Sequence, residues 1–583
     1  MGCRLQGSME AVLKDKKIYL TLFVVAAVMV FLLFDKRIFK EEIAVGQAVE
    51  QASRPREWNT LIADEINANG IKLIVDGKEI TTAQNSIFMN EDNLLMLAED
   101  LFADEFQCSL VCMDSRNVVL QKGAVKATIE IGQDFVTLNN GVSQVKNAAL
   151  LEAGKLYIQA EVLEKAFGYG YKWDINKNTL YLTDSRKGES VLPSRFSYAD
   201  IQKLPKVKNQ GNLSTCWAFA ANTALESRLM PKEKYTFSVD NMSRNNGFRG
   251  TQEDGGECMR AIAYLASWKG PVHESDDPYG DGICNYDAKA AKHVQEVQII
   301  DSKNFDSIKK AVFLYGGVQT SIYTQMTGST GNSWYYNKEN NAYCYVGTNR
   351  PNHDVVIVGW DDNYPKSNFN SKLEGDGAFI CMNSWGEEFG DNGLFYVSYY
   401  DSNIGMHNVV YTGIESTDNY DVIYQTDLCG WVGQMGYDDS TAYFSNVYTI
   451  GDDEILKAVS FYATGKATDY EIYIVNDYKS TASFEKMKFV QKGSLVNAGY
   501  YTVKLDEPIQ LAKGTQCAII VKIKTPGSVR PIAIEYRADY YTADVNLEDG
   551  CGYISLNGRS WEHVEETKNC NICLKMFTDK VNN

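Results

Sequence analysis

The chain has 583 residues, which is long enough for about three domains of ordinary size. Hydrophobic residues make up 44% of it and aromatic residues 12%, so packed cores are expected and a largely disordered chain is excluded. The formal net charge of −18 argues against binding to the phosphate backbone of nucleic acids, and we expect no nucleic-acid partner.

The first predicted element is an apolar segment, residues 18–34, which contains no charged residue. Its length is at the short end for a membrane-spanning helix. A cleaved signal peptide is the alternative, but a charged run follows the segment in place of small residues at a cleavage site. We therefore predict an uncleaved membrane anchor, with residues 1–17 in the cytoplasm and residues 35–70 as a stalk on the outside.

Residues 71–184 show the alternation of apolar and polar residues that is typical of short strands. Hairpin turns are predicted at Asp76-Gly77 and at Asn139-Asn140-Gly141. A short helix is predicted over residues 157–168, where Gly168 would end it. This part of the chain is therefore expected to form a small α+β domain.

A linker over residues 185–196 leads to a segment that carries the strongest chemical signal. Cys216 opens a run of good helix formers that ends before Pro231, and Ser214 and Thr215 are suitable residues for the start of a helix. Cys216 would then lie in the first turn, where the helix dipole stabilises a thiolate.

Two further motifs follow Cys216. His353 leads into a predicted strand, and Asn383 begins the segment Asn383-Ser384-Trp385-Gly386. Alone, each of these residues has an ordinary interpretation as a buried thiol, a structural histidine or a turn. Together, and in this order, they supply a nucleophile, its base and a residue that orients the base. Gln210, shortly before Cys216, would donate a hydrogen bond to the oxyanion.

This set of motifs resembles the papain family of cysteine peptidases. The resemblance implies a two-lobed catalytic domain over residues 197–413, with a helical lobe and a β-barrel lobe, which hydrolyses peptide bonds without a cofactor. It also makes Gly255 and Gly256 the bare wall of the non-primed part of the cleft, where the residues on the amino side of the scissile bond bind in an extended form. Trp385 would shield the hydrogen bond between His353 and Asn383, and we group it with the substrate-binding residues. The other interpretation of the two glycines is an ordinary turn before a helix.

The chain departs from the family pattern in two respects. A family disulfide near the nucleophile is absent, because its two positions correspond to Leu213 and, approximately, Glu253. We therefore expect packing to secure the loop before Cys216. In addition, no recognisable helical inhibitory propeptide precedes Leu192.

The flanking regions resemble two surface modules. Residues 71–184 are similar to the N-terminal domain of some copper amine oxidases, although this resemblance implies neither copper nor oxidase activity, since the segment has no histidine. Strand-like runs after residue 414 predict an antiparallel β-sandwich over residues 414–583, similar to a lectin-like domain. Trp431 and Trp561 could stack on a glycan there, but core packing is the favoured interpretation.

The cysteine and histidine pattern predicts no metal site. Cys570 and Cys573 have a spacing seen in zinc sites, but no second pair accompanies them and His563 fits no zinc pattern. We interpret the two cysteines as structural or as a local disulfide, and we expect no cofactor.

Taken together, the sequence predicts an α+β protein that acts as a cell-surface cysteine endopeptidase, with its catalytic and flanking domains outside the cell. Its partner would be a peptide or protein substrate, and the flanking domains could contact the cell wall or a glycan. The alternative is a non-catalytic adhesin or binding protein on a papain-like frame, which the intact set of four catalytic residues disfavours. A peptidoglycan amidase fits less well, because such enzymes lack the Gly-Gly and Asn-Ser-Trp-Gly segments.

Overall fold

The computed structural model describes residues 63, 66–68, 70–82, 85–139, 141–186, 191–325 and 333–581. The predicted anchor, residues 18–34, and most of the predicted stalk lie outside this set. Among the residues that are described, no helix is both long and apolar enough to cross a membrane. The chain divides into two compact units, and of the described residues the smaller one contains 63, 66–68, 70–71, 87–96 and 175–178. Within it, the side chain of Asn67 exchanges two hydrogen bonds of 2.8 Å with the backbone of Met89, in strand β3 (Ile87–Met89).

The N-terminal part of the larger unit contains the predicted small strands. β1 (Lys72–Val75) and β2 (Lys78–Ile80) form the expected hairpin, and Asp76 and Gly77 both adopt the positive φ that its tight turn needs. β13 (Thr179–Asp184) pairs in parallel with β1. The remaining elements between residues 95 and 174 are β4 (Leu95–Ala98), α3 (Asp100–Asp104), β5 (Ser109–Cys112), β6 (Asn117–Lys122), β7 (Val125–Glu130), β8 (Phe135–Leu138), β9 (Gly141–Gln144), β10 (Ala149–Glu152), β11 (Lys155–Gln159), α4 (Glu161–Phe167) and β12 (Tyr169–Asp174).

The helix predicted over residues 157–168 is shorter than expected. It begins at Glu161, and residues 155–159 form β11 instead, which pairs with β10. The reason is that Leu156, Tyr157 and Ile158 are buried in a strand pairing that the local helical pattern does not reveal. Gly168 ends the helix in the left-handed conformation, as predicted.

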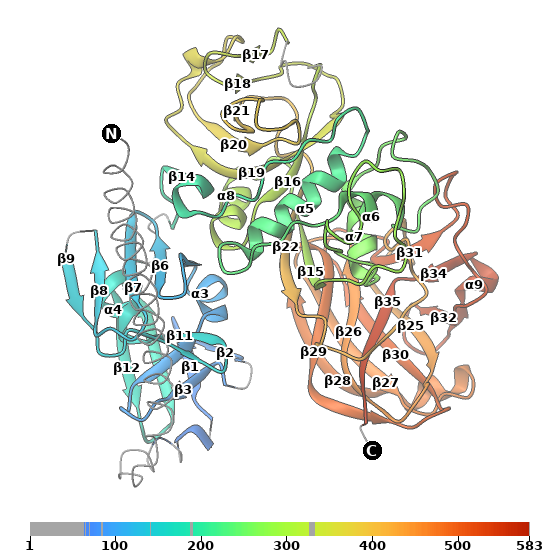
Figure 1. Ribbon diagram of the computed structural model, residues 1–583. Coiled ribbons are helices and arrows are strands. Elements are labelled where there is room, and N and C mark those ends of the chain that lie inside the picture. Colours follow the sequence, from blue (N-terminus) through green and yellow to red (C-terminus); the bar gives the residue numbers. More distant parts are fainter. Residues whose placement is uncertain are drawn as a thin grey trace, which may run out of the picture. The chain divides into compact units, whose positions relative to one another are not determined.

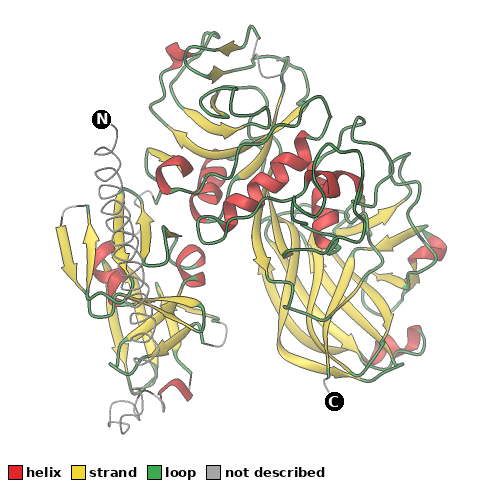
Figure 2. Ribbon diagram, in the orientation of Figure 1, coloured by secondary structure: helices red, strands yellow, loops and turns green. Residues whose placement is uncertain are grey.

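The middle of the chain contains most of the helices, which Figure 2 shows in red beside the yellow strands. They are α5 (Cys216–Leu229), α6 (Val239–Arg244), α7 (Cys258–Ala266) and α8 (Phe305–Leu314). Nearly the whole of α5 is buried, which agrees with its alanine-rich sequence and with its position between the other helices and the sheet (Figure 1). The strands of this part are β14 (Arg195–Ser197), β15 (His293–Ile300), β16 (Val318–Ile322), β17 (Tyr336–Asn337), β18 (Ala342–Tyr343), β19 (His353–Asp361), β20 (Ala378–Met382), β21 (Leu394–Ser398) and β22 (Asn408–Glu415).

The C-terminal part consists almost entirely of antiparallel strands. One layer contains β29 (Ala498–Leu511), β26 (Glu454–Ala463), β35 (Leu574–Lys580) and β23 (Val422–Tyr424). The other contains β28 (Lys488–Leu495), β27 (Thr468–Val475), β30 (Gln516–Lys524), β25 (Thr441–Thr449), β32 (Gly552–Ser555) and β33 (Glu562–His563). A smaller sheet and helix comprise β24 (Gly433–Met435), β31 (Ile532–Tyr536), β34 (Cys570–Ile572) and α9 (Val564–Thr567). An apolar core joins residues of both layers, as the predicted sandwich requires.

Two predictions for this C-terminal part concern the role of its tryptophans and the state of its Cys570–Cys573 pair. Trp561 stacks on Phe484 with ring centroids 4.1 Å apart, and Trp431 packs edge-on against Tyr462, so both rings serve packing. All twelve cysteines in the described part of the chain are free, including the buried Cys570 and Cys573.

One sheet continues from the middle of the chain into the C-terminal part. β15 pairs on one side with β22 and on the other with β29, both in antiparallel orientation. Gly499 makes this approach feasible, because its φ is +146° and a Cβ atom there would lie 2.0 Å from the carbonyl oxygen of Val297. The two regions are therefore hydrogen-bonded to each other along their backbones.

Candidate active site

Cys216 is the first residue of α5, as predicted. The backbone N–H groups of Asp354, Trp217 and Cys216 itself favour the thiolate, but burial outweighs them and, with the nearby Asp354 carboxylate, raises the pKa of the thiol to about 12. The helix dipole alone would lower this pKa, and the burial of the site acts in the opposite direction. Thr215 precedes the helix without capping it by its side chain.

His353 is the first residue of β19, and Asn383 directly follows β20. The Nε2 atom of His353 lies 2.8 Å from Oδ1 of Asn383. That Asn383 atom also accepts a hydrogen bond of 2.8 Å from the backbone N–H of Ser384, which can only donate, so its assignment as oxygen is secure. His353 therefore carries its proton on Nε2, and Nδ1 remains free to accept one.

Trp385 shields this hydrogen bond from solvent. Its ring stacks on that of His353 with centroids 4.7 Å apart and an interplanar angle of 27°. His353 is 5% exposed. Burial lowers the pKa of His353 to about 4, and the hydrogen bond with Asn383 opposes this shift.

Gln210 is held in a fixed orientation beside the segment that follows Asn383. Its Oε1 atom accepts a hydrogen bond of 2.7 Å from Ser384 Oγ, and its Nε2 atom donates one of 2.8 Å to the carbonyl oxygen of Leu213. An amide nitrogen has two protons, so one N–H of Gln210 is left to donate to another acceptor.

A different structural constraint favours glycine at each of the two positions of the predicted cleft wall. Gly255 has φ +77°, and a Cβ atom on Gly256 would lie 2.5 Å from the indole ring of Trp217. Cys216, His353 and Gly256 line one cleft of about 600 Å³, whereas Gly255 is not among the residues that line it. The structure therefore brings together the predicted thiol, imidazole and second glycine at a single cavity.

Hydrogen bonds secure the loop before Cys216, where packing had been expected to replace the missing disulfide. The N–H of Ser214 donates to the carbonyl oxygen of Gln252 at 3.1 Å, directly beside the two positions that lack cysteine. Thr215 Oγ1 and Tyr279 OH lie 2.7 Å apart, and Tyr279 OH also donates to the carbonyl oxygen of Gln210 at 2.9 Å.

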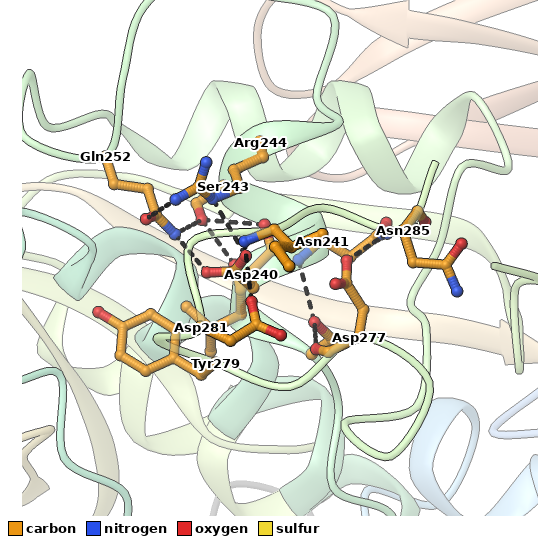
Figure 3. Close-up of polar contacts among 12 residues, drawn as sticks. Asp240, Asn241, Ser243, Arg244, Gln252, Asp277, Tyr279, Asp281 and Asn285 are labelled. Carbon is orange, nitrogen blue, oxygen red and sulfur yellow. Dashed lines mark hydrogen bonds and ion pairs between the residues drawn. The ribbon is translucent and has the colours of Figure 1, made fainter. Parts of the chain in front are cut away.

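The side chain of Gln252 anchors this loop to α6 (Figure 3). Its Nε2 atom donates to Asp240 Oδ1 at 2.7 Å and to Ser243 Oγ at 2.8 Å, and its Oε1 atom accepts from Arg244 at 2.9 Å. Sequence reasoning missed Gln252 and Tyr279, because no local pattern marks partners so far away in the chain.

A buried ion pair also connects the Gln210 loop with α5. Lys208 Nζ pairs with a carboxylate oxygen of Glu226, which has no exposed surface and also accepts a hydrogen bond from the N–H of Phe237 at 2.8 Å. Lys208 therefore fixes the start of the loop against the helix that begins with Cys216.

The described residues contain no group of histidine, cysteine, aspartate and glutamate side chains that could hold a metal ion.

Comparison with known protein families identifies three regions. Residues 192–414 match the papain family cysteine protease domain, residues 67–182 the copper amine oxidase N-terminal domain and residues 423–578 the lectin like domain. The chain thus carries a papain-family cysteine protease domain, preceded by a copper amine oxidase N-terminal-like domain and followed by a lectin-like domain.

Individual relatives support the same architecture. Cathepsin S of Bos taurus is 28% identical over 241 residues, which cover 40% of this chain and 66% of cathepsin S. The clostridial cysteine protease Cwp84 after propeptide cleavage matches with a TM-score of 0.59 and 28% identity, over 66% of this chain and 99% of that one. A structure of the protease and lectin-like domains of Cwp84, a surface layer associated protein of Clostridium difficile, gives a TM-score of 0.58 and 27% identity over 67% and 89%.

The Gln252 network leads to a prediction about stability. Replacing Gln252 with leucine keeps the approximate shape but leaves Asp240 and Arg244 with fewer partners in a buried site. We expect the free energy of unfolding to fall by about 1–3 kcal/mol, measured by denaturant unfolding followed by tryptophan fluorescence.

Gln516→Leu is the matched control, because Gln516 is exposed at the start of β30. Equal stability of the two variants would show that the hydrogen bonds of Gln252 do not stabilise the loop.

Proposed function

We propose that this chain is a cysteine endopeptidase that hydrolyses peptide bonds with Cys216 as nucleophile, His353 as base and Asn383 as the residue that orients His353. The observation that carries the proposal is the hydrogen bond between His353 and Asn383, which leaves Nδ1 of the ring unprotonated in the cleft that also holds the Cys216 thiol. Gln210 is the oxyanion donor of this proposal.

The charged forms of Cys216 and His353 arise together. Burial disfavours the thiolate and the imidazolium when either is alone, as the pKa values of about 12 and about 4 indicate. Transfer of the thiol proton to Nδ1 of His353 creates both charges within one cleft, where their mutual attraction in a buried site offsets the cost of burial.

The reaction follows from this pair. The sulfur of Cys216 forms a bond to the substrate carbonyl carbon, and the carbonyl oxygen becomes an oxyanion that accepts hydrogen bonds from the N–H of Cys216 and from the amide of Gln210. His353 then gives its proton to the leaving amine as the C–N bond breaks. Water, deprotonated by His353, attacks the remaining thioester, and the carboxylic acid product and the Cys216 thiol are released.

The first prediction of this proposal concerns the nucleophile. Iodoacetamide at neutral pH should label Cys216, and mass spectrometry should find the labelling strongly reduced in His353→Ala, because the variant lacks the base that accepts the thiol proton.

Cys258 provides an internal control, since its thiol lines the same cleft and burial raises its pKa. Preferential labelling of Cys258, or unchanged labelling in His353→Ala, would remove Cys216 from its assigned role. The alternative of a non-catalytic binding protein predicts no selective reaction at Cys216.

The second prediction concerns the oxyanion. Gln210→Ala should lower kcat for a peptide substrate by about 10²-fold or more, which is the scale of losing one such donor. The thermal midpoint of unfolding is measured alongside, because Gln210 also contacts Ser384 and Leu213. Full turnover in this variant would reduce Gln210 to a loop residue.

We further propose that residues 18–34 anchor the protein in the cell membrane, with the catalytic and flanking domains on the outside. The apolar sequence of this segment supports the proposal, as does the likeness to a protein that is described as surface layer associated. In this location the flanking domains would contact the cell wall or its glycans.

The third prediction tests the location. Fractionated cells should retain the protein in the membrane pellet until detergent is added, because an apolar helix leaves the bilayer only when the bilayer is dissolved. A soluble protein in the medium that begins shortly after residue 34 would instead establish a cleaved signal peptide.

A further inference from the structure

The cleft that holds Cys216 and His353 has an acidic lining. Three carboxylates line it, those of Glu257, Asp301 and Asp354, and no lysine or arginine does so within the described part of the chain. Apolar groups form much of the remaining wall, among them Met259 and Val409. The cleft therefore combines apolar walls with an excess of negative charge.

The three carboxylates differ in whether a positively charged side chain or solvent already stabilises their negative charge. Asp301 forms an ion pair with Lys466 at 2.7 Å, and Glu257 is exposed. Asp354 follows His353 in β19, and no lysine or arginine of the described residues forms an ion pair with it. His407, on the same cleft, is the side chain whose charge would act on Asp354 in the favourable sense.

Two donors from the neighbouring strand β16 fix the carboxylate of Asp354. Ser321 Oγ donates to its Oδ1 atom at 2.7 Å, and Gln319 Nε2 donates to its Oδ2 atom at 2.8 Å. Gln319 is itself positioned by a hydrogen bond of 3.1 Å from Tyr411. Each carboxylate oxygen can accept more than one hydrogen bond, so Asp354 still has capacity for a donor in the cleft.

Burial raises the pKa of Asp354, although the hydrogen bonds from Ser321 and Gln319 oppose this shift. A cation that enters the cleft would stabilise the ionised form of this buried carboxylate and lower its pKa again. Lysine and arginine side chains would supply such a cation, and their methylene stems suit apolar walls.

We propose that this cleft selects a substrate with a lysine or arginine side chain on the amino side of the scissile bond, and that Asp354 is the residue that binds its charged end. The inference rests on the proposed function, since it names the substrate class of the same site. The amino side follows from Gly256, which lines the cleft and belongs to the expected wall for that part of an extended substrate.

The experiment uses the full chain and peptide libraries in which each of the three positions before the scissile bond is varied over all amino acids. We expect the wild-type protein to favour lysine or arginine over leucine at one of these positions. In Asp354→Asn the ratio of kcat/KM for the basic peptide to that for the leucine peptide should fall at least about tenfold, the scale of a lost hydrogen bond to a charged group. Asparagine can still accept from Gln319 and donate to Ser321, so the change mainly removes the charge.

The ratio separates recognition from a merely structural role, because a distorted site would lower the rates for both peptides alike. Asp287→Asn is the matched control, since it removes an exposed carboxylate of the same domain that does not line the cleft. It should leave the ratio unchanged. If Asp354→Asn does not fold, Asp354→Ser provides the same comparison with a smaller side chain.

The outcomes that oppose the inference are distinct. Cleavage by the wild-type protein without any basic preference would overturn the inference and leave the proposed function intact. A preference that survives in the Asp354 variant would overturn the role of Asp354. Failure to cleave any peptide, together with no selective labelling of Cys216, would overturn the proposed function and this inference with it.

Discussion

The candidate site depends on one short pairing between two loops that are distant in the sequence. Asn209 and Trp385 form an antiparallel bridge, flanked by hydrogen bonds from Gln210 N–H to the Ser384 carbonyl oxygen at 2.8 Å and from Gly386 N–H to the Lys208 carbonyl oxygen at 2.9 Å. One loop leads to the helix with Cys216, and the other contains Asn383. This pairing therefore joins the loop of Gln210, which leads to Cys216, to the segment of Asn383, which in turn holds the ring of His353.

A buried ion pair holds one of the two paired loops in place. Lys208 reaches the buried Glu226 in α5, whose second carboxylate oxygen makes no hydrogen bond among the described residues. A buried ion pair contributes little net stability by itself, but removal of one partner is costly because the other charge stays buried. The loop is thus held in one position by interactions that would be expensive to break, which is a property that a catalytic site requires.

Local patterns predicted the elements of the site but not what connects them. The start of α5 at Cys216, the strand after His353 and the segment at Asn383 followed from helix propensity, strand pattern and motif order. Gln252 and Tyr279 could not be predicted, because their roles arise only when α6 and the loop before Cys216 meet in the folded chain. The burial that raises the pKa of Cys216 could not be predicted for a related reason, since burial is a tertiary property. At residues 157–159, strand pairing overrode a helical pattern. Strand-like runs separated by turns predicted the C-terminal sandwich, and a family resemblance predicted its lectin-like character. Its continuity with the peptidase sheet could not be predicted, because it depends on the register between β15 and β29.

That continuity has a consequence for how the protein can be divided. Without the C-terminal strands, β15 would become an exposed edge whose free N–H and C=O groups invite pairing with other chains. Ala498, at the start of β29, also lines the cleft beside Cys216. The lectin-like region therefore cannot be exchanged for another domain without exposing this edge. We expect the two regions to be inherited together and to fold and unfold as one cooperative unit.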